Sequence, residues 1–157
     1  MDPVLVKELH VLGAMLLFGT GLGTAFHFWR AQQSGVPVVI ATAARSAILA
    51  DWLFTAPAVV LQPVTVFFLA RAAGWPLDSF WILAALALYA LAGACWLPVV
   101  ALQYRLARLA EAAVATGTVL PAEHRRAARL WFGLGWPAFA ALLVVLHLMV
   151  AKPAAGW

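Results

Sequence analysis

Four long apolar segments, separated by short polar connectors, account for most of the chain. The first carries no charged residue from Leu9 to Trp29. At about 1.5 Å of rise per residue, a helix of that length crosses a hydrocarbon core of roughly 30 Å. The pattern recurs along the chain and predicts membrane-spanning helices at about residues 5–29, 46–72, 79–104 and 127–151. We therefore expect an all-α, four-helix transmembrane bundle that forms a single domain over residues 1–157.

The composition agrees with a protein embedded in a lipid bilayer. Hydrophobic residues make up 66% of the chain, charged residues make up 10%, and the mean hydropathy is +0.96, all far from the averages of soluble domains. The formal charge of +4 is concentrated in the connectors, so it indicates topology and not nucleic-acid binding. The single cysteine, Cys95, excludes an intramolecular disulfide and a multi-cysteine metal site.

Positive charge is unevenly distributed between the two ends of the predicted bundle. The end that holds both termini has only Lys7, Arg71 and Lys152. Because basic residues favour the cytoplasmic side, we expect the other connectors in the cytoplasm and both termini on the outer side of a bacterial inner (plasma) membrane. The arginines of those connectors and their flanks are Arg30, Arg45, Arg105, Arg108, Arg125, Arg126 and Arg129.

Two histidines near the outer ends of the first and last spans are the leading candidates for chemistry. His10 and His147 fall at a similar depth, and Gly13 leaves room for a flat ligand beside His10. Neutral imidazole binds haem iron, copper and zinc, and an ionisable residue inside a membrane often marks function. We therefore expect His10 and His147 to hold a cofactor or metal, with Gly13 and Trp136 at its wall. The alternative is that each histidine bonds a backbone carbonyl or interfacial water.

A second set of polar residues is expected in the interior of the bundle. A carboxylate in a medium of low dielectric constant must pair or take up a proton, which predicts that Asp51 pairs with His27 or Arg45. The whole set could line a path for a ligand or proton, or it could fasten the helices together. Its members are Asp51, Thr55, Gln62, Gln103 and His27.

Other residues have simpler interpretations. Pro57 and Pro63 each remove a backbone donor, which predicts a kinked second span with its freed carbonyls turned inward. His124 lies among arginines in a wet connector and is expected to be an ordinary surface residue. Gly19 and Gly23 form a GxxxG pair that serves either packing within the chain or a homodimer.

Several segments together resemble a known family. They are Leu9–Gly23, Ala50–Pro57, Leu61–Pro63, Gly93–Val100 and Trp131–Pro137. These segments are similar to a bacterial family of predicted integral membrane proteins known as domain of unknown function 2269. The resemblance spans nearly the whole chain and implies the architecture, but it implies no activity.

A more distant resemblance concerns the four-helix layout and the histidine near the start of the first span. Both are similar to copper-resistance D-like membrane proteins and to the HemJ-type protoporphyrinogen oxidase, which binds haem b. That similarity implies His10 as a candidate axial ligand. The oxidase family also has a functional lysine in its third helix, whereas no lysine lies between Lys7 and Lys152 here, so porphyrinogen oxidation is not implied.

The sequence favours a membrane protein that binds haem b or another redox cofactor within the bundle and takes part in electron transfer or oxidation. One alternative is a small transporter or metal-handling protein in which Asp51, Gln62 and Gln103 line a polar path. Another is a structural membrane subunit. No motif specifies a substrate or a catalytic reaction.

Overall fold

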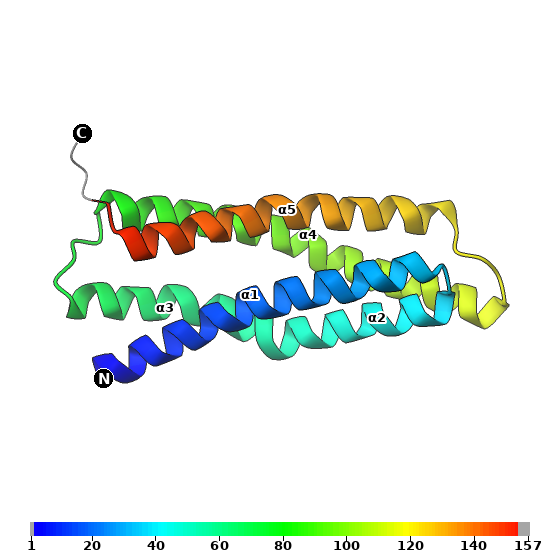
Figure 1. Cartoon of the computed structure of the whole chain (residues 1–157), viewed down its shortest axis with the longest axis horizontal. Coiled ribbons are helices and arrows are strands. Elements are labelled where there is room, and N and C mark those ends of the chain that lie inside the picture. The colour runs from blue at the N-terminus through cyan, green and yellow to red at the C-terminus, as the bar shows by residue number, and fades with distance from the viewer. Residues whose placement is uncertain (1, 154–157) are drawn as a thin grey trace.

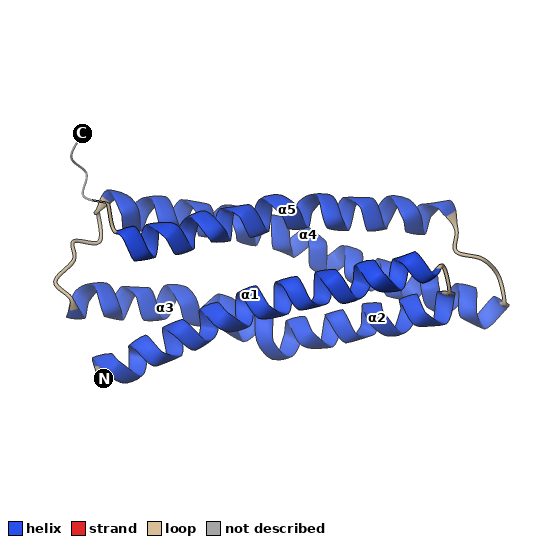
Figure 2. Cartoon of the chain, viewed as in Figure 1, coloured by secondary structure: helices blue, strands red, loops and turns tan. Residues whose placement is uncertain are grey.

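The computed structural model describes residues 2–153, which fold into long helices joined by short loops (Figures 1 and 2). No strand occurs in this part of the chain. The second span is divided into three helical elements without a loop between them. The elements are α1 (Pro3–Ser34), α2 (Pro37–Ala50), the π-helix η1 (Asp51–Thr55), α3 (Ala56–Ala72), α4 (Phe80–Thr116) and α5 (Ala122–Ala151).

Within residues 2–153, four helices are long and apolar enough to cross a membrane. They are Pro3–Ser34, Pro37–Ala72, Phe80–Thr116 and Ala122–Ala151. The predicted all-α bundle of four membrane-spanning helices is therefore confirmed. Figure 1 shows the start of α1 and the end of α5 at the same end of the bundle, as expected for an even number of spans.

The helices are not packed equally against one another. α4 packs along α5 and α2, and α1 packs against α2 and α3, whereas α1 and α5 barely touch. We call the end of the bundle that holds the α1–α2 and α4–α5 connectors the connector end. The core there is built around Phe28, Ile40 and Leu106, with many alanines between them. Small side chains let helix backbones approach closely when lipid supplies no hydrophobic driving force. Tight packing is therefore concentrated at one end of the bundle.

The second span begins earlier than expected. The sequence predicts its start near residue 46, but α2 starts at Pro37, two residues after Gly35 ends α1 in the left-handed conformation with φ 64°. Proline suits the first turn of a helix because its missing N–H is not needed there. The additional turns bury Ile40 and Ala44, and this burial stabilises the longer helix.

The kink expected around Pro57 takes the form of a π-helical turn. In η1, the backbone N–H of Ala56 donates to the carbonyl of Asp51, five residues earlier. Pro57 cannot donate to Leu53, and its ring would crowd that carbonyl in a regular α-helix. The wider turn accommodates this conflict, and such turns are frequent at functional sites. The turn also buries Asp51 and Thr55 in the bundle.

One prediction for a residue at the connector end is wrong. His124 was expected on the surface, but its side chain is fully buried, with no exposed area. The reason is that α5 already begins at Ala122, so His124 lies in its first turn and faces inward. The ion pair between Arg105 and Glu123 is exposed beside it, with 2.8 Å between Nη2 and Oε1.

Candidate functional site

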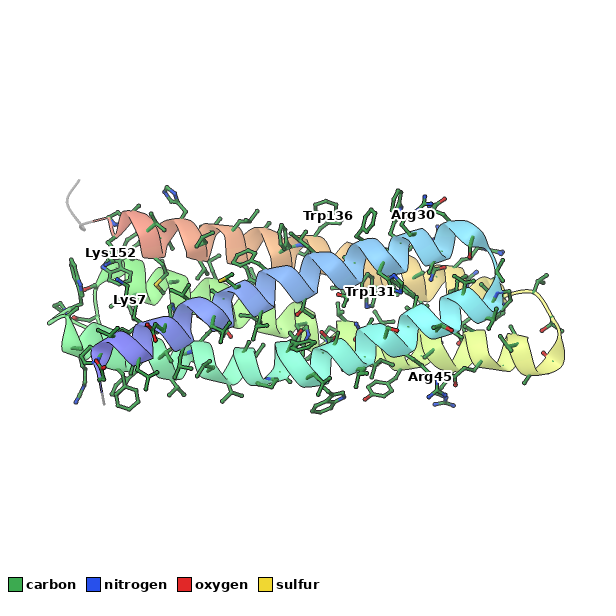
Figure 3. All side chains as sticks on the ribbon, turned by 60° about the horizontal axis from the view of Figure 1, so that its bottom comes forward. Lys7, Arg30, Arg45, Trp131, Trp136 and Lys152 are labelled. Carbon is green, nitrogen blue, oxygen red and sulfur yellow. The ribbon has the colours of Figure 1, made fainter. Side chains whose placement is uncertain are left out.

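A cavity of about 660 Å³ lies among α1, η1, α4 and α5. Its walls are mainly apolar and aromatic. Trp131 is 5% exposed and Trp136 is 72% exposed, so one indole lies inside the bundle and the other at its outer surface (Figure 3). The cavity therefore reaches from the interior toward the lipid. Its aromatic lining consists of Phe26, Trp29, Tyr89, Trp96, Trp131, Phe132, Trp136 and Phe139.

One wall of this cavity is polar. Asp51 and Thr55 from η1, and Gln103 from α4, line it and are 8%, 7% and 3% exposed. The side chains of Thr55, Gln103 and Trp96 lie beside the Asp51 carboxyl. Yet the Thr55 hydroxyl, the Trp96 indole nitrogen and Gln103 Oε1 make no hydrogen bond of regular geometry with any described residue. We call these four residues, Asp51, Thr55, Trp96 and Gln103, the polar wall.

The Asp51 carboxyl faces no basic side chain in the cavity. No lysine, arginine or histidine belongs to the cavity lining. The expected pairing of Asp51 with His27 or Arg45 is wrong, because Arg45 pairs with Glu111 and His27 is exposed. The neighbouring Phe28 takes the buried position on α1, and one residue turns a helix by about 100°. His27 therefore lies outside the interior set.

Tyr89 lines the same cavity and satisfies a backbone group in the second span. Its hydroxyl donates to the Val59 carbonyl oxygen at 2.8 Å. Val59 lies four residues before Pro63, so its carbonyl is the one that proline leaves without a helical donor. This contact matches the expected inward turn of a freed carbonyl. The sequence shows that Val59 lies four residues before Pro63. The donor to its carbonyl, Tyr89, could be identified only from the packing of α4.

His10 belongs to a different polar group, which joins α1 to α3. Its Nδ1 lies 2.8 Å from the Thr65 hydroxyl, and that hydroxyl also lies 2.8 Å from the Leu61 carbonyl oxygen. Gln62 Nε2 donates to the His10 carbonyl oxygen at 2.8 Å. A Cβ atom at Gly13 would lie 2.5 Å from Gln62 Nε2, so glycine makes room for this amide. We call His10, Gln62 and Thr65 the interhelix bridge.

The residues predicted to form a cofactor site are not brought together. His10 lies in the interhelix bridge, Gly13 contacts Gln62, and His147 is exposed on α5. Of the predicted group, only Trp136 lines the cavity. Similar depth along the bundle did not bring the imidazoles into one cleft, because depth does not determine which way each helix face points. The residues present therefore do not fit a haem held between His10 and His147.

The polar interior was predicted more accurately than the histidine site. Asp51, Thr55 and Gln103 are all buried and all line one cavity. Gln62 is buried too, but its amide is used for helix packing. Trp131 was missed, although it lines the cavity and its buried indole nitrogen has no hydrogen-bond partner among residues 2–153. No sequence pattern around Trp131 indicated this role.

Four apolar spans with a polar wall turned inward define an integral membrane protein. The family described as "Predicted integral membrane protein (DUF2269)" matches residues 4–153, and the chain belongs to this family. No curated protein and no solved structure matches the chain. The more distant similarity to copper-resistance D-like and HemJ-type proteins is not shown by these comparisons.

The two histidines should differ in their effect on stability. We expect His10→Ala to lower the free energy of unfolding by about 1 kcal/mol, because it removes the hydrogen bond to Thr65. His147→Ala, at an exposed position, should leave stability unchanged. Thermal unfolding of both variants in mild detergent measures this difference. Equal destabilisation by the two substitutions would contradict the separate placement of the imidazoles.

Proposed function

We propose that this protein binds a membrane-soluble molecule, with an apolar body and a polar head, in the cavity among α1, η1, α4 and α5. The observation that carries the proposal is the polar wall. Thr55, Trp96 and Gln103 each have a polar atom with no regular hydrogen bond, and leaving such buried atoms unpaired is costly. A bound polar head would supply the missing partners.

The rest of the cavity suits the apolar body of such a molecule. A volume of about 660 Å³ lies within the usual range for small-molecule sites, which are mostly apolar with a few placed polar groups. Phe26 and Trp136 line the cavity and are 64% and 72% exposed. Because these rings lie where lipid would surround the helices, the ligand can enter from the bilayer without crossing water.

The cavity is compatible with some of the functions expected from the sequence and not with others. A planar redox molecule other than haem has the required chemistry, whereas haem lacks support because no histidine lines the cavity. A small transporter is equally compatible with the same binding site. In that case, Asp51 and Gln103 would meet the transported molecule, and Gln62 would not, since its amide bonds the His10 carbonyl.

Filling the cavity should abolish binding without unfolding the protein. Gly93 lines the cavity, and a Cβ atom there would have nothing within 4 Å. We expect Gly93→Phe to occupy the site and weaken binding at least about tenfold. Gly133→Phe is the matched control, because Gly133 also has open space but does not line the cavity.

The measurement uses quenching of tryptophan fluorescence by amphipathic probes of neutral, negative and positive charge, with protein in mild detergent. At least one probe should bind to the wild type and to Gly133→Phe. Native mass spectrometry of the purified protein would identify any lipid-soluble molecule that remains bound. Equal probe binding by Gly93→Phe and Gly133→Phe would refute this location of the site.

We also propose that the α1–α2 and α4–α5 connectors lie in the cytoplasm of a bacterium and that both termini lie outside. Arg30 and Arg45 lie at the connector end, and Lys7 and Lys152 lie at the other (Figure 3). The excess of arginine at the connector end supports this orientation. Alkaline phosphatase fused to the C-terminus should be active, and green fluorescent protein fused there should be dark. The opposite pattern would reverse the orientation.

A homodimer through Gly19 and Gly23 is a separate proposal. Both glycines are exposed, and a Cβ atom at either one would meet nothing within 4 Å. Their GxxxG spacing is therefore free for contact with a second helix. Replacing both by leucine should convert a dimer into a monomer in analytical ultracentrifugation, whereas Gly133→Leu should not. A wild type that sediments as a monomer would exclude the dimer.

A further inference from the structure

We infer that the molecule bound in the cavity is a lipophilic organic cation and that its binding releases a proton from Asp51. This inference rests on the proposed function, because it names the chemical class that the same cavity would select. It is carried by the burial of the Asp51 carboxyl, by the absence of a basic side chain in the cavity lining, and by the rings around it.

The first step concerns the charge of Asp51. Its side chain is 8% exposed and lines the cavity. Both ion pairs found within residues 2–153 lie elsewhere, between Arg45 and Glu111 and between Arg105 and Glu123. A buried carboxylate without a cationic partner is disfavoured, so in this proposal it carries a proton while the cavity holds no cation. A cationic ligand is the partner that makes the ionised form favourable.

The second step concerns the groups beside the carboxyl. Thr55, Gln103 and Trp96 each bring a hydrogen-bond donor close to Asp51. When a cation binds and Asp51 ionises, its carboxylate oxygens can accept from these donors, so the Thr55 hydroxyl and the Trp96 indole nitrogen gain partners without an acceptor on the ligand. Gln103 Oε1 has no partner among the described residues and adds a second negative dipole for a cation. The polar wall is therefore built to hold negative charge when a positive ligand compensates it.

The third step concerns the aromatic lining. Trp29, Tyr89, Trp96 and Trp131 line the cavity together with Asp51. The faces of aromatic rings carry partial negative charge and attract cations, most strongly when water is excluded. Apolar substituents on the cation would fill the remaining space, as in a quaternary ammonium or phosphonium ion. An anionic amphiphile would face both the carboxyl and the ring faces and would be rejected.

The proton released on binding can be assigned to one group. The lining contains no histidine, lysine, arginine or cysteine. Tyr89 is the other titratable residue in the lining, and its hydroxyl already donates to the Val59 carbonyl. The exchange is balanced: the O–H bond of the Asp51 carboxyl breaks, the cation pairs with the carboxylate, and the proton leaves to the solvent. Because the proton competes with the cation, affinity should rise as the pH rises.

The test uses two probes of the same shape and opposite charge, tetraphenylphosphonium and tetraphenylborate. The full-length protein in a neutral detergent should bind tetraphenylphosphonium at least about tenfold more tightly than tetraphenylborate. Asp51→Asn should reduce phosphonium affinity at least about tenfold, while Asp51→Glu, which keeps the carboxyl, should retain much of it. Asp78→Asn is the control, since Asp78 is an exposed loop carboxylate.

Proton release is measured with a pH indicator in weakly buffered solution. We expect phosphonium binding to acidify the solution in the wild type and in Asp78→Asn, but not in Asp51→Asn. Thermal unfolding verifies that each variant is folded. If Asp51→Asn does not fold, Asp51→Glu supplies the test, because it should still bind phosphonium and release a proton. Equal binding of the two probes, or unchanged phosphonium binding by folded Asp51→Asn, would overturn the cation inference and leave the proposed function standing. If neutral, anionic and cationic probes all fail to bind the wild type, both proposals are wrong.

Discussion

Hydrocarbon offers no hydrogen-bond partner, so every backbone N–H and C=O inside a bilayer must find one within the protein. The second span meets this constraint with difficulty because it contains two prolines beyond its first turn. Pro63 leaves the Val59 carbonyl without its helical donor, and the Tyr89 hydroxyl supplies one from α4. Before Pro57, the chain adopts the π turn that begins at Asp51. Both adjustments border the cavity, since Val59, Tyr89 and Asp51 all line it.

The unequal pairing of the helices explains why a cavity remains. α1 and α5 barely touch along their length, and large aromatic side chains make their contacts. Phe18 meets Phe139 edge to face at 5.7 Å, and Phe28 meets Trp131 at 5.1 Å between ring centroids. Phe139 and Trp131 belong to the cavity lining. Bulky rings in contact between α1 and α5 keep the two helix backbones apart. The same rings therefore form part of the cavity wall and preserve the space between the helices.

The sequence predicted the spans well because hydropathy over a long window reports directly on the cost of placing polar groups in lipid. It also predicted the burial of Asp51, Thr55 and Gln103, for which exposure to lipid would be unfavourable. The start of α2 was predicted too late, since the helix already begins at Pro37 and packs on α4. Gly35 and Pro37 could have indicated this boundary.

The histidines show where sequence reasoning fails. Similar depth made His10 and His147 appear to be partners, but depth follows from residue number whereas direction depends on how each helix is rotated against its neighbours. His147 is exposed, and His124, which an arginine-rich flank marked as a surface residue, is fully buried. An imidazole ring has both polar and apolar parts, so a histidine can be buried in a core or exposed at a surface. Its residue type therefore carries less positional information than a carboxylate or a carboxamide.

The interhelix bridge and the polar wall differ in whether their polar groups have hydrogen-bond partners. In the interhelix bridge, the His10 ring, the Gln62 amide and the Thr65 hydroxyl all have partners within hydrogen-bond distance. In the polar wall, a hydroxyl, an indole nitrogen and an amide oxygen lack regular partners beside a buried carboxyl. Each unpaired buried group costs about 1–3 kcal/mol. A network with its bonds made stabilises helix packing by itself. The polar wall lacks such bonds and would gain them when another molecule binds there, which is why we propose the binding site beside Asp51 and not beside His10.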